Sequence, residues 1–313
     1  MVSARFARGT LIAAFCFFPL LTAICPAQGG WESAGVLNVP PYNYSFLAAT
    51  PEGNLLAATF HTASPGNPPR QLPALLIRDP ASEQPQVEEL AKVSFEVYRG
   101  YGGIACDPEG GYFVSGDTGD PKTCFIRKYT AEGVLHPVFG DGGEIKPGRR
   151  TLGLDVVADY LLVAMDWGEI AIYETGTGQS LGSITAATNP VYIRDIAADP
   201  KSMRIFGVAE GGIFTWGGGA PWDTSSYHFR QFTEQVGQLR AGEGIAIDPI
   251  RRTVLIVPIP GNTLHELHGD GKVDTCEITT AGADSHLADL VVSFDGTTLY
   301  ISAILNGKIH TMR

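Results

Sequence analysis

The stretch Gly244–Pro258, GIAIDPIRRTVLIVP, indicates the fold of this chain. A short apolar run is followed by Asp-Pro and then by a second apolar run. Short runs rich in β-branched residues are typical of buried strands. Asp-Pro is a turn signal, because Pro presets its own φ angle and Asp accepts hydrogen bonds from the backbone beyond it. The stretch therefore predicts two antiparallel strands joined by a tight turn.

The same pattern recurs along the chain. Clear copies start at Gly103 (GIACDPEGGYFVSG), Asp195 (DIAADPKSMRIFGVA) and Asp289 (DLVVSFDGTTLYIS). Weaker copies start at Phe46 (FLAATPEGNLLAAT) and Asp155 (DVVADYLLVAMD). The six starts lie roughly 40 to 57 residues apart, a period typical of propellers with one multi-stranded blade per repeat. We therefore predict an all-β, six-bladed β-propeller with four-stranded blades; two β-sandwich domains are the alternative.

The two ends of the sequence predict how the ring closes. The last repeat ends at Arg313 after its third strand, and Ser33–Val39 lies ahead of the first repeat. We expect Ser33–Val39 to form the fourth strand of the last blade, which removes the exposed edges of an open sheet. The Gly- and Pro-rich insertions at 61–75 and 217–227 are expected to be surface loops. No long helix is predicted, apart from a short turn near Glu88–Lys92.

Residues 1–27 are predicted to be a secretory signal peptide. Two arginines precede the apolar run Leu11–Ile24, which is shorter than the ~20 residues that a membrane helix needs. Cys25-Pro26-Ala27 offers a cleavage site with small residues in the right places. An uncleaved anchor and a lipoprotein modified at Cys25 are the alternatives. We expect residues 28–313 to form a single propeller domain that is secreted or periplasmic.

The charge balance limits the partners of the protein. The chain has 33 Asp and Glu against 22 Lys and Arg, a net charge of −11. An acidic exterior disfavours nucleic acids and anionic membranes as partners. We expect a monomer that binds a small molecule or a protein, with no nucleic acid and no membrane contact after signal cleavage.

Three cysteines follow the predicted leader, Cys106, Cys124 and Cys276, so at least one thiol is unpaired within the chain. We expect Cys106 and Cys124 on the first and third strands of one blade. Two strand spacings amount to about 9–10 Å, which exceeds the ~7 Å Cα limit for a disulfide. Free thiols are therefore favoured; a bridge would require Cys124 to lie in the turn.

Some of these repeats resemble known propeller repeats. GIACDPEGGYFVSG and GIAIDP resemble NHL-type repeats, and VVSFDGTTLYIS is similar to the strand pair of YVTN-type repeats. The resemblance covers residues 31–313 and implies a distant similarity to the gluconolactonase and senescence-marker-protein superfamily. Six-bladed members of that superfamily bind a divalent metal in the central funnel through carboxylate and Asn side chains. The motifs imply an architecture rather than an activity, because propellers host many functions.

In that superfamily the metal ligands come just ahead of the innermost strand. The matching positions here are Ser45, Gly102, Leu154, Arg194, Glu243 and Ala288. Only Glu243 is a carboxylate, and a hard cation needs several oxygen ligands. No cofactor is therefore predicted, and a calcium-like divalent cation is the alternative.

Asp155, Asp195 and Asp289 are predicted to share an equivalent position one residue further along. Together with Glu243, these carboxylates could bind a metal near the ring axis or act as acid and base. The structural alternative is that each Asp bonds backbone amides of the next blade.

Four side chains are predicted to face the funnel as ligand-binding candidates: Tyr101, Arg194, Glu243 and His286. Solvated loop residues are the alternative interpretation of this set. His265 and His268 should lie on opposite faces of a strand, so a shared metal is not expected. The sequence contains no Gly-x-Ser-x-Gly, phosphate loop or dinucleotide fingerprint, and catalytic residues stay unassigned.

These observations favour an exported NHL-like propeller that acts as a ligand- or protein-binding scaffold. The alternative is a divergent metal-dependent hydrolase or lyase of the lactonase type, with its site in the central funnel. Whether the protein is an enzyme therefore stays open in the sequence.

Overall fold

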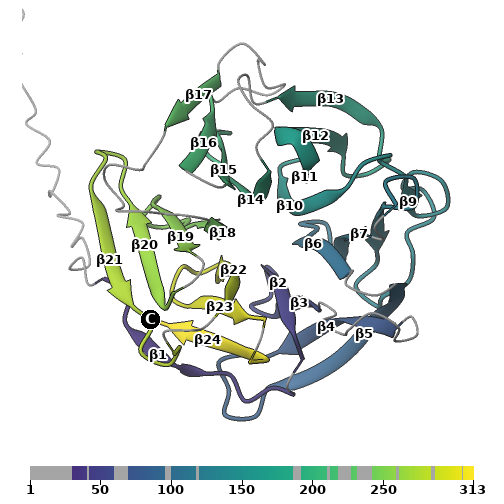
Figure 1. Ribbon diagram of the computed structural model, residues 1–313. Coiled ribbons are helices and arrows are strands. Elements are labelled where there is room, and N and C mark those ends of the chain that lie inside the picture. The colour runs from purple at the N-terminus through teal and green to yellow at the C-terminus, as the bar shows by residue number, and fades with distance from the viewer. Residues whose placement is uncertain are drawn as a thin grey trace, which may run out of the picture. The chain divides into compact units, whose positions relative to one another are not determined.

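The computed structural model describes residues 30–313 except 41, 60–69, 96–99, 118–119, 186–191, 210–211, 218–226, 231–241, 259–260, 283–285 and 305. Trp31–Arg313 is one compact unit with six four-stranded antiparallel sheets around a central axis (Figure 1). The predicted all-β, six-bladed propeller is therefore confirmed. The predicted signal peptide lies outside the described residues.

Each blade begins with its innermost strand and proceeds outward. Blade 1 contains β2 (Tyr44–Ala49), β3 (Leu55–Thr59), β4 (Arg70–Arg78) and β5 (Gln86–Phe95). Blade 2 contains β6 (Gly100–Cys106), β7 (Tyr112–Asp117), β8 (Phe125–Tyr129) and β9 (Glu144–Ile145). Blade 3 contains β10 (Thr151–Val157), β11 (Tyr160–Met165), β12 (Glu169–Glu174) and β13 (Ser180–Thr185). Blade 4 contains β14 (Ile193–Ala198), β15 (Ile205–Ala209), β16 (Gly212–Trp216) and β17 (Tyr227–Arg230). Blade 5 contains β18 (Gly242–Ile247), β19 (Val254–Pro258), β20 (Thr263–Leu267) and β21 (Val273–Glu277). Blade 6 contains β22 (Leu287–Val292), β23 (Leu299–Ala303), β24 (Lys308–Met312) and β1 (Ser33–Val36). The single described helical turn, η1 (Asp166–Gly168), joins β11 to β12.

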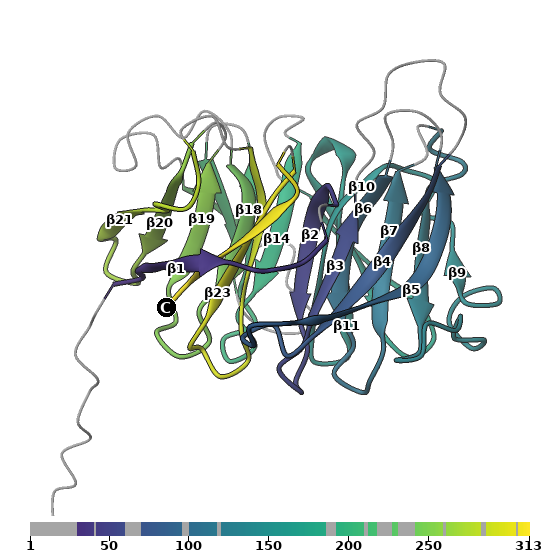
Figure 2. The same cartoon turned by 90° about the horizontal axis from the view of Figure 1, so that it is seen from below.

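The ring closes by pairing the first strand with the last. β1 pairs antiparallel with β24, and Glu32 and Arg313 exchange two backbone hydrogen bonds of 2.8 and 2.9 Å. Trp31, only 4% exposed, continues the closure by packing among the side chains of blades 5 and 6. The side view of Figure 2 shows β1 lying along the outer edge of this last blade. The predicted closure by Ser33–Val39 is confirmed for Ser33–Val36.

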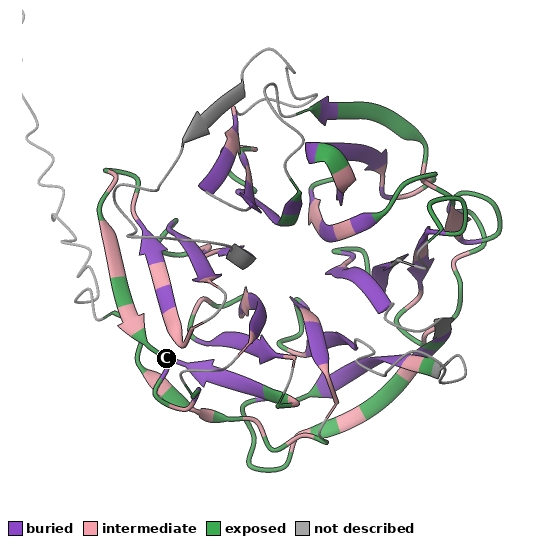
Figure 3. Ribbon diagram, viewed as in Figure 1, coloured by how far each residue is buried: buried purple, intermediate pink, exposed green. Residues whose placement is uncertain are grey.

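The hydrophobic core is divided into six clusters, each between two consecutive blades. A sheet whose two faces are both covered needs apolar side chains on both, and so the inner strands show no polar alternation. In Figure 3 the inner strands are mostly buried, while the outer strands β5, β13 and β21 carry exposed positions. The unbroken apolar runs of the repeats thus predict the strands that face neighbouring blades.

Glycines allow the innermost strands to approach one another. A Cβ atom added to Gly153 would lie 2.9 Å from the Cα of Asp195, and one added to Gly244 would lie 2.6 Å from the Cα of Asp289. Real Cβ atoms do not come this close to backbone, so these positions exclude larger residues. The glycine at a repeat start therefore has a packing role at the centre of the ring.

The third repeat has a different register from the one predicted. Each innermost strand has a bulge near its start, followed by Phe46, Gly103, Gly153, Asp195, Gly244 or Asp289. The repeat in blade 3 therefore starts at Gly153, and Asp155 lies two residues beyond the position of Asp195 and Asp289. The error arises at the turn, because only Ala158 and Asp159 separate paired Val157 and Tyr160, whereas longer turns close the other five inner hairpins.

Other local predictions have mixed outcomes. Glu88–Lys92 lies within β5 and forms no turn, and residues 70–75 of the first insertion belong to β4. Most of the two insertions otherwise lies outside the described residues. All three described cysteines are free thiols, as favoured by the predicted strand spacing. No helix in the described ranges is long and apolar enough to cross a lipid bilayer.

Candidate functional site

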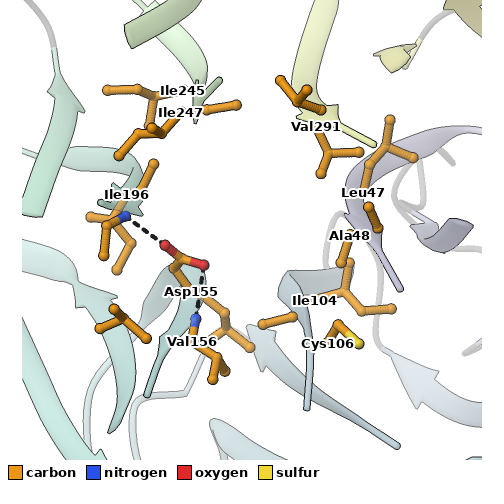
Figure 4. A pocket seen from close by; sticks show the side chains of 18 of the residues that line it. Leu47, Ala48, Ile104, Cys106, Asp155, Val156, Ile196, Ile245, Ile247 and Val291 are labelled. Atoms are coloured by element: carbon orange, nitrogen blue, oxygen red, sulfur yellow. Dashed lines mark hydrogen bonds between the residues drawn. The ribbon is translucent and has the colours of Figure 1, made fainter. Parts of the chain in front are cut away.

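The six innermost strands enclose a channel with a cavity of about 360 Å³ along the propeller axis. All six blades contribute to its wall, and most of the lining side chains are Ala, Val, Ile, Leu or Pro. Figure 4 shows Leu47, Ile104, Ile196, Ile245 and Val291 arranged around this space. The innermost strands alternate their side chains between the two neighbouring blade interfaces, and residues of all six line the cavity.

The cavity has a mouth and a polar inner end. Its mouth lies at the turns that follow the innermost strands, where Pro51, Pro108, Pro200, Pro249 and Phe294 form the rim. Phe294 is 58% exposed. The inner end contains Asp155, Asp195 and Asp289. The channel is therefore apolar near its rim, and carboxyl groups line it further in.

The three carboxyl groups join neighbouring blades. Asp195 accepts from the amide of Ile196 at 2.9 Å and from that of Ile245, in the next blade, at 3.0 Å. Asp289 accepts from Leu290 at 2.7 Å and from Leu47 at 2.6 Å, which connects blade 6 to blade 1. An innermost strand is a sheet edge whose alternate amides have no partner strand, and the carboxylates take up some of these donors.

Asp155 makes the same connection two residues nearer the mouth. Its Oδ1 accepts from Val156 at 2.8 Å, and its Oδ2 accepts from Ala198 of blade 4 at 2.6 Å. A shift of two residues preserves the direction of a side chain on a strand, so Asp155 still reaches the next blade. Of the three residues, Asp155 is partly exposed, whereas Asp195 and Asp289 are each 5% exposed.

Burial shifts the ionisation of all three groups in one direction. It raises the pKa of Asp155 and of Asp289 to about 7, against the amide bonds, which act to lower it. Burial also raises the pKa of Asp195, and the neighbouring carboxyl of Asp289 raises it further. Asp195 and Asp289 are close enough to hydrogen-bond, so this pair takes up one proton more readily than an isolated acid does.

The predicted metal ligands do not converge within the described residues. No three Asp, Glu, His or Cys side chains there are grouped so that they could hold a metal ion. Each of the carboxylate oxygens of Asp155, Asp195 and Asp289 already accepts a backbone amide. The structural alternative, in which each Asp bonds amides of the next blade, is therefore what these three residues show. Glu243 lies in β18, but its side chain lies outside the described residues.

Tyr101 does not face the channel. It is 2% exposed, packs between blades 1 and 2, and donates its hydroxyl to the carbonyl of Leu72 at 3.0 Å. Burial raises its pKa above the ordinary value. Its predicted place in the funnel is wrong, because its side chain points into the blade interface beside the bulge that precedes Gly103.

Arg194 and His286 lie ahead of the cavity. Arg194 is exposed on β14, one residue before Asp195, and His286 is partly buried directly before β22. Neither residue lines the cavity. The residues predicted from the starts of the innermost strands thus lie toward one end of the channel, and the apolar cavity extends toward the other.

Two other histidines are explained by local bonds. His265 bonds the hydroxyl of Thr275 at 3.0 Å, and His268 bonds the carboxylate of Asp274 at 2.9 Å. These two bonds go to different partners.

The structure adds lining residues that the sequence analysis did not select. Cys106, Val156, Ile247, Val291 and Phe294 all line the cavity and are at least partly exposed. Their sequence signal was visible, since they end the first apolar run of a repeat or follow it. That signal predicts a buried core position, because an apolar residue that faces a channel has the same sequence pattern as one that faces a neighbouring blade.

Two solved structures share the fold over most of the chain. The selenomethionine-substituted virginiamycin B lyase from Staphylococcus aureus matches with a TM-score of 0.59 and 11% identity, over 90% of this chain and 99% of that one. A streptogramin B lyase structure matches with a TM-score of 0.59 and 12% identity, over 90% and 97% of the two chains. At this identity the likeness shows the propeller fold alone. It does not confirm the assignment to NHL or gluconolactonase proteins.

No protein-family model matches the chain, and a search of curated proteins finds no match.

Proposed function

We propose that this chain is a binding propeller that holds a small apolar ligand in its central channel. The observation that carries the proposal is the cavity of about 360 Å³, whose wall is built from apolar side chains of all six blades. Concave, mostly apolar cavities with a few polar groups are the usual form of small-molecule sites. The rim of prolines and the exposed Phe294 would give such a ligand an apolar entrance.

The carboxyl groups support binding more than catalysis. A catalytic acid or base must reach a substrate proton, whereas Asp195 and Asp289 are each only 5% exposed and accept backbone amides at both oxygens. The bonds of Asp155, Asp195 and Asp289 join blades 3 to 4, 4 to 5 and 6 to 1. Three groups that hold the ring together are constrained in how far they can move.

The proposal is tested by titrating the protein with prodan, a neutral apolar dye whose emission shifts when it leaves water. We expect saturable binding to the unmodified protein. Val291→Phe places a larger side chain in the channel and should weaken dye binding about tenfold, which corresponds to about 1.4 kcal/mol.

The matched control is Val134→Phe, because Val134 is 61% exposed and does not line the channel. This variant should bind the dye as the unmodified protein does. Equal affinity in Val291→Phe and Val134→Phe, with both folded by their melting curves, would contradict binding in the channel.

A divergent hydrolase or lyase of the lactonase type is the second candidate. It is favoured by two carboxyl groups with a pKa of about 7 near the axis, and by the two lyases that share the fold. In this case Glu243, the three Asp residues or His286 would carry the chemistry, with a calcium-like divalent cation as cofactor.

Melting curves in EDTA and then with Ca²⁺, Mg²⁺, Mn²⁺ or Zn²⁺ test the second candidate. A ligand of the native state at 100 times its Kd adds about 2.7 kcal/mol to stability. A raised melting temperature that is lost in Glu243→Gln would support a metal-dependent enzyme. No shift with any ion would remove the cation from this proposal.

Export and a monomeric state are also part of the proposal. They rest on the apolar run Leu11–Ile24 with its cleavage site and on the acidic net charge. Mass spectrometry of the protein from an expressing cell should find an N-terminus at Gln28, and gel filtration should give the mass of one chain. An uncleaved N-terminus in the envelope fraction would favour the anchor instead.

A further inference from the structure

We infer that the channel ligand carries a positively charged amine or ammonium group on an apolar body, with the charge placed near the carboxyl group of Asp155. This inference rests on the proposed function, because it names the chemical class of the ligand in the same cavity. It follows from the distribution of charge along the channel, from the position of Asp155 and from its partial exposure.

The ionisable residues of the lining are all acidic or neutral. They are Asp155, Asp195, Asp289 and Cys106, and there is no Lys, Arg or His among the lining residues that the structure describes. A negatively charged ligand would therefore meet carboxyl groups with no cation to balance it. In a cavity with low-dielectric walls the Coulomb energy of close charges is larger than in water, so the sign of the ligand charge matters.

Asp155 is the group within reach of a ligand. Asp195 and Asp289 are each 5% exposed, while Asp155 is a partly exposed residue that lines the cavity. Asp155 also lies two residues nearer the mouth, and Figure 4 shows it among the apolar side chains of the wall. A ligand that enters from the rim would thus contact Asp155 before the other two.

The hydrogen bonds of Asp155 leave room for a further donor. Each of its oxygens accepts one backbone amide, from Val156 and from Ala198. A carboxylate has about four acceptor sites, so a second donor at either oxygen is compatible with both bonds. An ammonium group supplies such donors together with the opposite charge, and charge-assisted hydrogen bonds of this kind are the strong ones.

Three probes with the same chain and different head groups test the inference by calorimetry: octylamine, 1-octanol and octanoate. We expect octylamine to bind at least about tenfold more tightly than 1-octanol, a difference of about 1.4 kcal/mol. Octanoate should bind most weakly. All three share the apolar body, so differences between them report the head group alone.

Asp155→Asn removes the charge while keeping an acceptor for one of the two amides. This variant should lose the preference for octylamine over 1-octanol. The matched control is Asp159→Asn, because Asp159 is exposed in the following turn and does not line the cavity. The control should keep the full preference for the amine.

The pH dependence of the unmodified protein gives a readout that needs no variant. Burial raises the pKa of Asp155 to about 7, so its charge is lost as the pH falls from 8 to 5. Octylamine stays protonated over this range and should bind more weakly at pH 5, while 1-octanol should not change. Asp195, Asp289 and Cys106 are the titratable groups that share the channel with Asp155, and the pKa of Cys106 is raised to about 12.

The outcomes separate the two proposals. Binding of 1-octanol without a preference for octylamine, in the unmodified protein, would overturn the amine and leave the apolar channel site intact. Equal preference in Asp155→Asn and Asp159→Asn would also overturn it. Absence of binding by any of the three probes would overturn the channel site itself.

Discussion

A single aspartate on an innermost strand bonds two blades at once. Asp289 accepts the amide of Leu290 in its own blade and that of Leu47 in the next one along the ring. Both bonds lie in an interior where water cannot replace them, since Asp289 is 5% exposed. The residue therefore contributes to stability through buried donors that would otherwise have no partner.

Asp289→Ala should destabilise the ring by leaving two buried amides without an acceptor. Each such group costs about 1–3 kcal/mol, so we expect a loss of about 2–6 kcal/mol in urea unfolding. Asp295→Ala is the control, because Asp295 accepts bonds from Ser293 and Thr297 in an exposed turn. A similar loss in both variants would show that burial of the acceptor is not the cause.

Lys128 is the buried cation of the described part of the core. Its Nζ lies 2.7 Å from Asp107 Oδ2 and donates to the carbonyl of Thr175 in blade 3 at 3.1 Å. Side-chain exposures are 3% for Lys128 and 2% for Asp107. Lys128→Met should cost about 3–5 kcal/mol in unfolding free energy, because it leaves the carboxylate buried and unpaired.

The double variant Lys128→Met, Asp107→Asn checks the reason for that loss. Removing both charges should restore part of the stability that the single variant loses. The opposite outcome is a double variant that loses as much stability as the sum of the losses in Lys128→Met and in Asp107→Asn. The two charges would then not depend on each other, and the loss in Lys128→Met would come from packing alone.

At the level of the strand, the repeat predicted most of the architecture. Apolar runs separated by turns, with Asp-Pro in three of them, identify the inner two strands of five blades at their observed positions, because the turn chemistry is local. The third repeat is misaligned, since its Val157–Tyr160 hairpin has a turn of only two residues and is shorter than the others. A shift of two residues keeps the inside–outside pattern of a strand, so hydrophobicity could not reveal the error.

β1 and the residues just ahead of it close the ring. Trp31, next to β1, is 4% exposed and lies under the guanidinium of Arg251 at 4.6 Å from the ring centre. Trp31→Ala should cost about 3–5 kcal/mol in urea unfolding, as for other large buried aromatics. Deleting residues 28–42 should lower the melting temperature of the whole ring, since β24 would become an edge.

Trp167→Ala provides the comparison for Trp31→Ala, because Trp167 is 56% exposed. It should change the unfolding free energy far less. An unchanged melting temperature after deletion of residues 28–42 would show that the ring does not depend on its closing strand.

At the level of the whole molecule, the candidate site is a product of ring closure. The cavity exists because six innermost strands meet at the axis, and no repeat by itself shows how wide the opening is. The polar residues at the starts of the innermost strands predict ligand-binding candidates, among them Glu243, Arg194 and His286. The apolar end of the channel, with Val291 and Phe294, could not be told from core by its composition.

The stability of the ring should fall as the pH rises from about 4 to about 7. The folded state holds protons on Asp155 and Asp289 up to a pKa of about 7, while the usual value for Asp is 3.8. Between these values unfolding releases protons, so stabilisation that is present at the acid end is lost toward pH 7. Water in the channel reduces the contribution of Asp155, which is partly exposed.

Urea unfolding at several pH values, compared with Asp289→Asn, measures this dependence. The variant should lack part of the slope between pH 4 and 7. Exposed carboxylates whose pKa is lowered, such as Asp274 and Asp295, act below this window, because their charge is lost only at lower pH. Equal slopes in the two proteins would contradict a raised pKa at Asp289.

The pairing of β1 with β24 also has a consequence for the order of events during synthesis. β1 is made before every other described strand, and its neighbour is made after every other one. Five blades can therefore form on the ribosome while blade 6 stays open, with Trp31 still lacking its place in the core. We expect the ring to close only after β24 has emerged from the ribosome, so that blade 6 is the last blade to form.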